Sequence, residues 1–294
     1  MKILLTGATG YLGSHLTKAF LADGHQVVAL KREKSSLRFL VGVEDKICFY
    51  DIENLDLAKP FQEQGPIDAV VHTATCYGKL GESKSEILAT NTTFPLRLLE
   101  TATFFNTATF FNTDTFFNTD TILSPYLNAY SLSKKQFSEW GRQISVANRI
   151  RFLNIRIEHM YGSGDNPSKF ATWIAEQCLN NVPIVDLTSG EQLRDFIYID
   201  DVVSAYQYLL QNLISLSSEF HELSLGTGSP VRLREFIELV HHLSHSSTRL
   251  RFGALPYREH EIMKSCADLS VLTAMGWQPK IDLEQGILKL LDVR

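Results

Sequence analysis

A tyrosine and a lysine four residues apart are the clearest pair of side chains that could perform chemistry. They stand in Tyr130-Ser131-Leu132-Ser133-Lys134, a Y-x-x-x-K pattern whose helical spacing continues through Phe137 and Trp140. Side chains at i and i+4 share one face of a helix, and an ammonium group beside a phenol lowers the tyrosine pKa. Tyr130 would then be a usable acid or base near neutral pH. The pattern also arises by chance in surface helices, so its meaning depends on the elements around it.

A glycine-rich turn near the N-terminus predicts a nucleotide site. A buried strand at residues 1–5 leads into Gly7-Ala8-Thr9-Gly10-Tyr11-Leu12-Gly13, followed by helical spacing to Ala22 and a second strand at residues 26–30. Gly7 permits the tight turn, Gly10 lets the backbone approach a pyrophosphate, and Gly13 lets the helix pack closely on the strand. The helix N-terminus adds free N–H groups and a positive dipole end. An ordinary strand–helix turn is the alternative, and the βαβ context favours the nucleotide.

The end of the second strand indicates which dinucleotide is bound. A site for NAD usually has an acidic residue there, which bonds the ribose 2′-hydroxyl. This strand ends in Lys31-Arg32, with no carboxylate before Glu33. Two cations suit a 2′-phosphate, so we expect NADP(H), with a solvated charged strand end as the alternative.

Further strands alternate with helices and predict a doubly wound parallel sheet of Rossmann type. Strands at residues 46–50 and 68–73 end at Asp51-Ile52 and at Thr73-Ala74-Thr75, and Asn91 opens a helix. Ligands bind beyond the carboxyl ends of such strands. We expect an NADP-binding domain at residues 1–165, to which residues 190–215 return, and a smaller, mainly C-terminal substrate lobe within residues 166–294.

Composition excludes several classes of protein. The chain has 294 residues, 44% of them hydrophobic, which excludes intrinsic disorder. Its 28 Lys and Arg against 33 Asp and Glu argue against nucleic-acid binding. The first apolar run is too short for a signal or a membrane span, and the four cysteines have no metal-ligand spacing. We therefore expect a cytoplasmic protein without a metal, and we interpret His241, His242 and His245 as one solvated helix face.

Six of the 18 phenylalanines belong to a six-residue repeat. Residues 104–109 read FFNTAT, and residues 110–115 and 116–121 both read FFNTDT. Side chains of a strand alternate between its two faces with a period of two residues. Because six is a multiple of two, a shift of the strand by one copy leaves every side chain on the same face. The pattern alone does not show which copy forms a strand.

Together these motifs resemble the extended short-chain dehydrogenase/reductase family, the NAD-dependent epimerases, dehydratases and reductases of nucleotide sugars. The resemblance covers nearly the whole chain. It rests on the glycine-rich turn, Asp51-Ile52, residues 72–74, Asn91, Tyr130 with Lys134, residues 156–162, residues 194–201, Gly226-Thr227-Gly228 and residues 275–279. It implies that Thr9, Tyr11, Leu12, Thr73, Ala74, Thr75 and Asn91 bind the cofactor with the glycines and with Asp51 and Ile52.

The family also requires a Ser or Thr hydroxyl at the end of the strand before the catalytic tyrosine. Thr107, Thr113 and Thr119 lie 16, 22 and 28 residues after Asn91. A helix of three to four turns, a loop and a strand take about 20 to 25 residues. We therefore expect Thr113 to act with Tyr130 and Lys134, and Asp114 to contact the substrate. Dehydratases follow this Thr-Asp with Glu, whereas this chain has Thr115.

Asp114 is present without the neighbouring Glu that dehydratases use, and the end of the second strand suits NADPH. Both observations favour a ketone reductase. Within the family, the chain is similar to the reductases that convert CDP-4-keto-3,6-dideoxyglucose to CDP-paratose or CDP-abequose for O-antigen sugars. By this resemblance, His159, Arg194 and Arg258 bind the CDP-linked substrate, and the chain forms a homodimer. The alternative role for Arg194 is an ion pair with Asp195 or Asp200 instead of substrate binding. A 4-epimerase or 4,6-dehydratase and a non-catalytic NADP-sensing module are the alternative functions.

Overall fold

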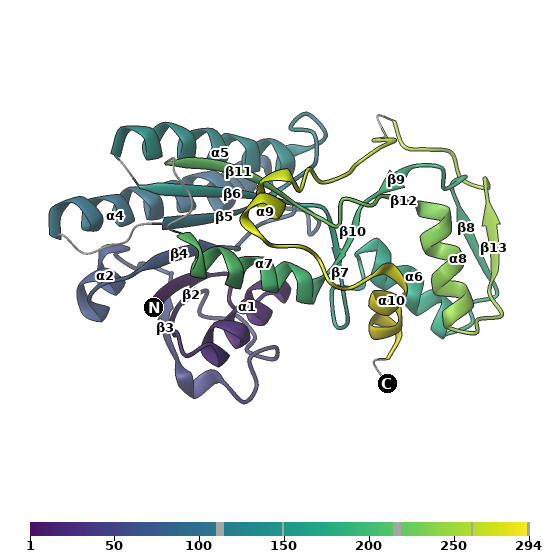
Figure 1. The fold of residues 1–294 in the computed structure, drawn as a ribbon, viewed down its shortest axis with the longest axis horizontal. Helices are drawn as coiled ribbons and strands as arrows, with labels where there is room; N and C mark the ends of the chain where they lie inside the picture. The colour runs from purple at the N-terminus through teal and green to yellow at the C-terminus, as the bar shows by residue number, and fades with distance from the viewer. Residues whose placement is uncertain (110–114, 149, 214–218, 260, 293–294) are drawn as a thin grey trace. The chain divides into compact units, whose positions relative to one another are not determined.

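A seven-stranded sheet, in the order β11-β6-β5-β4-β1-β2-β3, is the framework of the N-terminal part of the computed structural model (Figure 1). The structure describes residues 1–109, 115–148, 150–213, 219–259 and 261–292. The pairs from β3 to β5 are parallel. The strands are β1 (Lys2–Thr6), β2 (Gln26–Lys31), β3 (Ile47–Asp51), β4 (Ala69–His72), β5 (Thr115–Thr121), β6 (Arg151–Ile157) and β11 (Phe220–Leu225). The chain starts in the middle of the sheet and builds outward both ways, which confirms the expected doubly wound α/β fold.

Helices cover both faces of this sheet, as Figure 1 shows. On one face lie α2 (Ala58–Gln64), α4 (Phe94–Thr109) and α5 (Ala129–Asn148), and on the other lie α1 (Tyr11–Ala22) and α7 (Ile199–Gln211). The short helix α3 (Lys84–Leu88) runs through a π-turn at Ala89–Thr93 directly into α4. Because both faces are covered, the central strands are buried throughout, and β1 and β4 read as continuous apolar runs.

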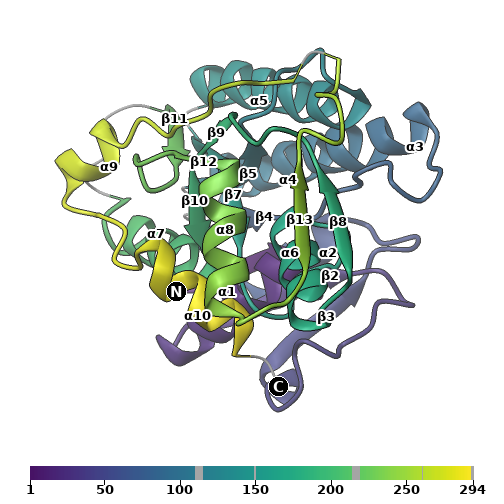
Figure 2. The same cartoon turned by 90° about the vertical axis from the view of Figure 1, so that its right-hand side faces the viewer.

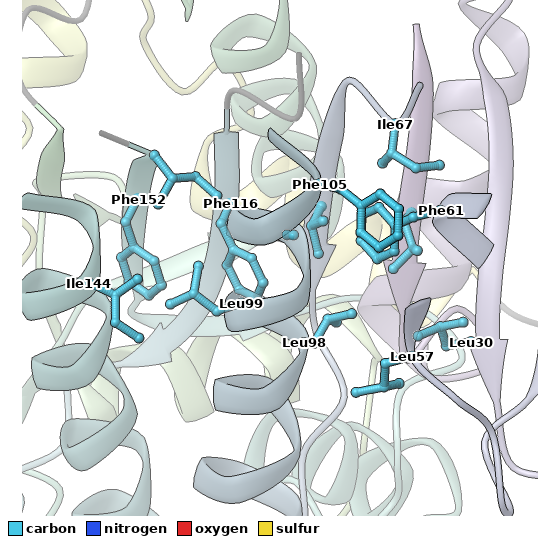
Figure 3. Packing of buried hydrophobic residues seen from close by; sticks show 14 of the residues in the cluster. Leu30, Leu57, Phe61, Ile67, Leu98, Leu99, Phe105, Phe116, Ile144 and Phe152 are labelled. Carbon is cyan, nitrogen blue, oxygen red and sulfur yellow. The ribbon is translucent and has the colours of Figure 1, made fainter. Parts of the chain in front are cut away.

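The core under α4 and α5 combines aliphatic side chains with five buried phenylalanine rings (Figure 3). Phe116 of β5 stacks on Phe152 of β6 at 5.5 Å between ring centroids, and Phe61 of α2 stacks on Phe105 of α4 at 5.2 Å. Leu98 and Leu99 are fully buried in the same cluster, in which the first copy of the repeat buries one of its two phenylalanines. Burying each large ring contributes about 1.5 to 3 kcal/mol.

The third copy of the repeat forms the strand before the catalytic helix. Helix α4 continues to Thr109 and so takes up the first copy, and β5 begins at Thr115. Asn118 is the register partner of His72 in β4. Our estimate of three to four helical turns after Asn91 was too short, because α4 alone has 16 residues and follows the π-turn that contains Asn91. Thr113 and Asp114 lie outside the described residues.

The chain divides into two compact units. The first comprises Met1–Arg156 and Tyr206–Leu223, and the second Ile157–Ala205 and Ser224–Arg294. The chain thus leaves the first unit earlier than the expected residue 165, and the returning segment differs from the expected residues 190–215.

The second unit contains three two-stranded sheets, β10–β7, β12–β9 and β13–β8 (Figure 2). Helix α8 packs against both α6 and α10. The elements are β7 (His159–Tyr161), α6 (Phe170–Leu179), β8 (Ile184–Leu187), β9 (Leu193–Arg194), β10 (Phe196–Tyr198), β12 (Val231–Arg232), α8 (Leu233–Leu243), β13 (Arg249–Phe252), α9 (Ser270–Met275) and α10 (Leu283–Leu291). Among the described helices of the whole chain, none has the length and apolar character needed to cross a membrane.

Candidate active site

Helix α5 places Tyr130 in its first turn and Lys134 one turn further on. The start of the helix is fixed by Asn128, whose side-chain oxygen accepts the backbone N–H of Ser131 at 2.9 Å. In return, the Ser131 hydroxyl oxygen accepts the backbone N–H of Asn128 at 3.2 Å. Such reciprocal bonds satisfy N–H groups at a helix start. The Y-x-x-x-K pair therefore lies on a helix, and Lys134 is only 2% exposed.

Burial shifts the pKa values of these two groups in opposite directions. It raises the pKa of Tyr130 far above its ordinary value, and the nearby Tyr77 and Asp120 add to this rise. Burial lowers the pKa of Lys134 to about 8, against the opposing effect of the Asp120 carboxylate. We expected the ammonium to lower the pKa of Tyr130. In the structure, loss of solvation outweighs every other influence on this phenol, because a buried phenolate lacks water.

Thr121, the last residue of β5, supplies the hydroxyl beside Tyr130. Its side chain lies near the Tyr130 phenol and opposes the rise in the pKa of Tyr130. Thr119 lies two residues earlier in the strand, and its hydroxyl bonds that of Tyr206 at 2.7 Å. The hydroxyl that the structure brings to Tyr130 thus belongs to the sixth position of the third copy, rather than to the fourth position at which we had placed it with Thr113.

A buried polar chain lies next to this hydroxyl. Asp120 accepts hydrogen bonds from the backbone N–H of Thr121 and from the side-chain amide of Asn154, both at 2.8 Å. The Asn154 amide oxygen in turn accepts from Asn118 at 2.7 Å. Sequence reasoning missed Asp120 and Thr121. The signal for both was the identity of the second and third copies, which gives every residue of one copy an equivalent in the other.

The glycine-rich turn packs tightly because its glycines lack side chains. A Cβ on Gly13 would lie 2.0 Å from the Gly7 carbonyl oxygen, so the helix packs directly on the turn. Gly7 has φ +74°, a conformation that favours glycine. Gly10 is exposed, caps α1 without a side-chain bond, and leads into a first turn that has no acidic residue. Free N–H groups and a positive helix end fit a dinucleotide pyrophosphate here. Thr9, Tyr11 and Leu12 lie on the same turn.

The loop after β4 packs against the glycine-rich turn. Ala74 donates its backbone N–H to the Thr6 hydroxyl at 3.3 Å, and Thr73 donates its hydroxyl to the Thr6 carbonyl at 2.8 Å. A Cβ on Gly7 would lie 2.6 Å from the Ala74 nitrogen. The ends of β1 and β4 therefore form one edge, as we expected for a cofactor site. Asn91 is fully buried and bonds Thr75 and Cys76, so it positions the loop from below.

Arg32 is the available cation at the end of β2. Lys31 forms an ion pair with Asp51 across β2 and β3, whereas Arg32 is exposed and has no partner among the described residues. The backbone N–H of Ile52 donates to the Lys31 carbonyl at 2.9 Å. Of the two cations that we expected to attract a 2′-phosphate, Lys31 is thus already neutralised by a carboxylate.

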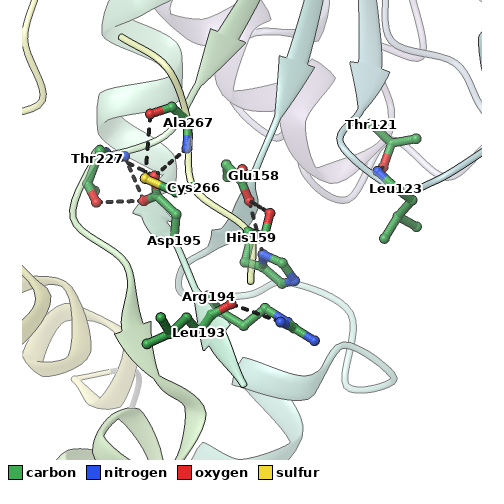
Figure 4. A network of polar contacts seen from close by, with 12 residues as sticks. Thr121, Leu123, Glu158, His159, Leu193, Arg194, Asp195, Thr227, Cys266 and Ala267 are labelled. Atoms are coloured by element: carbon green, nitrogen blue, oxygen red, sulfur yellow. Dashed lines mark hydrogen bonds and ion pairs between the residues drawn. The ribbon is translucent and has the colours of Figure 1, made fainter. Parts of the chain in front are cut away.

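In the second unit, Arg194 and His159 lie in a network of polar contacts (Figure 4). Arg194 pairs with Glu261 at 2.5 Å, rather than with Asp195 or Asp200. Asp195 accepts from Thr227, Gly228 and Ala267. Arg194 therefore forms an ion pair, as the alternative interpretation predicted, but its partner is Glu261.

The other two predicted substrate contacts of this unit lie in different settings. The ring of His159 lies 3.4 Å from the buried Glu158 carboxylate, while Arg258 is exposed. In the part of the chain that the structure describes, no group of three or more His, Cys, Asp or Glu side chains is placed to hold a metal ion.

The fold and the site define a member of one enzyme family. The model of the NAD dependent epimerase/dehydratase family matches residues 3–219, and the chain belongs to this family. Membership implies NAD or NADP as the cofactor.

Known proteins are similar to this chain over nearly its full length. CDP-abequose synthase of Salmonella muenchen is 35% identical over 294 residues, covering 100% of this chain and 98% of that protein. CDP-abequose synthase of Salmonella typhimurium LT2 is 36% identical over 98% of this chain and 97% of that protein. The crystal structure of UDP-glucose 4-epimerase from Thermotoga maritima, determined with UDP-glucose, has the same fold, with a TM-score of 0.83 at 20% identity over 99% of this chain and 98% of that one.

Proposed function

We propose that this protein reduces the 4-keto group of CDP-4-keto-3,6-dideoxyglucose with NADPH, giving CDP-paratose or CDP-abequose for O-antigen sugar synthesis. The observation that carries the proposal is the Thr121 side chain beside the Tyr130 phenol, with the buried Lys134 one helical turn further on, in a chain similar over its full length to CDP-abequose synthases.

The residues around Tyr130 suit reduction better than dehydration. Removing water from a sugar needs a base and an acid, commonly a neighbouring Asp and Glu. In the strand beside Tyr130, Asp120 is followed by Thr121. The one carboxylate present is buried and already accepts two hydrogen bonds, from Thr121 and Asn154. A single engaged carboxylate next to a hydroxyl supports a reductase.

Each residue of the site has a distinct role in this reaction. The bound cofactor would supply a hydride to the keto carbon. Tyr130 holds its proton at neutral pH, as any phenol does, and burial raises its pKa further; it donates that proton to the developing alkoxide. Thr121 donates a hydrogen bond to the same oxygen. Lys134 carries a positive charge below about pH 8 and stabilises the phenolate that remains.

NADPH as the consumed cofactor is supported by the strand end at Arg32. Its exposed guanidinium has no partner among the described residues and suits a phosphate on the ribose 2′ position. In the second unit, Arg194 and Arg258 would hold the diphosphate of the substrate, since guanidinium groups make paired bonds to phosphate oxygens. Glu261 would then keep Arg194 oriented until the substrate binds.

A homodimer also belongs to the proposal. Helices α4 and α5 leave several apolar side chains at the surface, and exposed apolar groups favour an interface. These are Phe104 (62% exposed), Trp140 (49%) and Val146 (66%). Sedimentation analysis should give twice the chain mass of 33.2 kDa, and Trp140→Lys should shift it to one chain mass. A monomeric wild-type protein would contradict this part of the proposal.

The role of Tyr130 is tested by Tyr130→Phe. Because this change removes the proton donor but keeps the ring, turnover should fall by about 10²-fold or more, with the dissociation constant of NADPH unchanged. Tyr126→Phe is the matched control, since Tyr126 is 91% exposed. Near-normal turnover of the Tyr130 variant in a stopped-flow NADPH assay would refute the assignment.

A further inference from the structure

An aromatic ring outside the proposed mechanism lies directly beside the proton donor. Tyr77, on the loop after β4, has its ring centroid 5.0 Å from that of Tyr130, with 37° between the ring planes. The side chain of Tyr77 is nevertheless 49% exposed. A ligand whose carbonyl oxygen accepts a proton from Tyr130 would therefore lie against an aromatic surface.

We propose that Tyr77 determines substrate specificity by contacting the sugar carbon next to the reacting carbonyl and favouring a methylene group there over a hydroxyl-bearing carbon. This inference rests on the proposed function, because it takes Tyr130 as the proton donor to a keto sugar. It names the chemical class that the site would select, a keto sugar that is deoxygenated beside its carbonyl.

Asn91 holds the backbone next to Tyr77 in place. The Asn91 amide oxygen accepts the backbone N–H of Cys76 at 2.7 Å, and its NH₂ group donates to the Cys76 carbonyl at 2.8 Å. The same NH₂ group donates to the Ser133 hydroxyl at 3.0 Å, and Ser133 donates to the Tyr130 carbonyl at 2.8 Å. These bonds run from the residue before Tyr77 to the helical turn that carries Tyr130, so the two rings are positioned by one buried amide.

The residue after Tyr77 also restricts the backbone of this loop. Gly78 has φ +69°, and a Cβ at this position would lie 2.6 Å from the side chain of Ile87 in α3. The chain therefore turns at Gly78 against a packed helix. Asn91 and the packing of Gly78 on Ile87 therefore define the backbone on both sides of Tyr77, and the contact with Tyr130 orients its ring.

The chemistry of the ring indicates what it selects. The face of a phenol offers apolar contact area and no hydrogen-bond acceptor as strong as water. A sugar hydroxyl pressed against this face would lose its water without gaining a partner, whereas a methylene group would lose nothing. Discrimination by an apolar surface against an added hydroxyl reaches about 10²-fold in enzymes.

The test compares two substrates in one assay. Wild type, Tyr77→Ala, Tyr77→Phe and the exposed-tyrosine control Tyr126→Ala are each given NADPH with CDP-4-keto-3,6-dideoxyglucose or with CDP-4-keto-6-deoxyglucose, which has a 3-hydroxyl. Specificity is measured as kcat/KM for the 3,6-dideoxy substrate divided by kcat/KM for the 3-hydroxyl substrate. We expect Tyr77→Ala to lower this ratio by about tenfold, which is within the discrimination of about 10²-fold that an apolar surface provides. Tyr77→Phe should keep the ratio, because it keeps the ring, and Tyr126→Ala should match wild type in both rates.

The outcomes separate this inference from the proposed function. An unchanged ratio in Tyr77→Ala, with wild type active, would overturn the role of Tyr77 alone, as would a changed ratio in Tyr77→Phe, which would assign recognition to the hydroxyl. Equal loss on both substrates together with weaker NADPH binding would show a merely structural role. If wild type reduces neither keto sugar, the proposed function is overturned and this inference with it.

Discussion

Tyr130 and Lys134 are one turn apart in α5, yet burial changes their ionisation in opposite ways. The phenol keeps its proton, and the pKa of Lys134 is lowered to about 8. A reductase needs the proton on Tyr130 at the start of the reaction and the charge on Lys134 when the phenolate forms. Both conditions hold near pH 7. As pH rises through about 8, Lys134 loses its charge, so we expect the rate of reduction to fall on the alkaline side.

Asp120→Asn tests this electrostatic arrangement. The Asp120 carboxylate raises the pKa of Lys134, so its removal should lower that pKa further. We therefore expect the alkaline limb of the profile of kcat against pH to move to lower pH. Asp186→Asn, which changes an exposed aspartate in the second unit, is the control and should leave the limb in place. An unmoved limb in Asp120→Asn would contradict the role of Asp120.

Arg32 has a testable role in the choice of cofactor. If its guanidinium binds the 2′-phosphate, Arg32→Ala should raise the KM for NADPH by about tenfold or more and leave the KM for NADH nearly unchanged, as expected for one charge-assisted contact. Lys34→Ala removes an exposed cation two residues away and is the matched control. Equal effects of Arg32→Ala on both cofactors would contradict recognition of the phosphate.

At the scale of elements, β5 carries the least usual feature of the chain. Deleting residues 110–115 or residues 116–121 gives the same sequence, because both copies read FFNTDT. The shortened chain keeps a threonine before Phe-Phe-Asn-Thr-Asp-Thr, as Thr109 takes the place of the buried Thr115. We expect this deletion to leave a folded protein that retains reductase activity, with cooperative thermal unfolding as the measurement. Loss of folding would show that the added length is required.

Point variants locate the active hydroxyl. Thr121→Val should lower kcat by about 10²-fold, because it removes a donor to the reacting oxygen. Thr119→Val has the same chemistry at the position that bonds Tyr206, and should lower stability by about 1 kcal/mol with a much smaller effect on kcat. The reverse order of the two effects on kcat would contradict the placement of Thr121.

This element also shows what sequence reasoning could predict. The β1–α1–β2 unit followed from the glycine spacing, since Gly7 and Gly13 are required by a positive φ and a direct helix contact. The Tyr130–Lys134 pair followed from its i, i+4 spacing. The threonine did not, because a six-residue repeat preserves the face of every side chain and a helix length cannot be counted from composition. The contact between Tyr77 and Tyr130 depends on Asn91, 14 residues after Tyr77, and left no pattern in the sequence.

At the scale of the whole molecule, the two units depend on different kinds of interaction. The first has a large apolar core against its sheet, in which five phenylalanines pack among aliphatic side chains. Among the described residues of the second, β7 to β10, β12 and β13 form two-stranded sheets, and one buried carboxylate joins several of its segments. Asp195 accepts two bonds from Thr227, one from Gly228 and one from Ala267, at 2.6 to 3.0 Å.

Asp195→Ala should therefore destabilise the second unit strongly. The change leaves one buried and two partly buried N–H groups without an acceptor, and we expect a loss of about 3 to 5 kcal/mol in the free energy of unfolding by urea. Tryptophan fluorescence is a suitable probe, since Trp173 and Trp277 lie in this unit. Asp186→Ala, which breaks an exposed ion pair with Arg251, should cost less than about 1 kcal/mol. A similar cost for both variants would contradict the role given to Asp195.

NMR of the product shows whether the chain is an NADPH-dependent 4-keto reductase. The purified protein is incubated with CDP-4-keto-3,6-dideoxyglucose and NADPH, or NADH in a parallel reaction. We expect one NADPH oxidised per sugar and a single CDP-3,6-dideoxyhexose with a new hydroxyl at carbon 4, formed faster with NADPH than with NADH. Unchanged keto sugar and unconsumed NADPH, or a protein that retains NAD and interconverts CDP-hexoses, would contradict it.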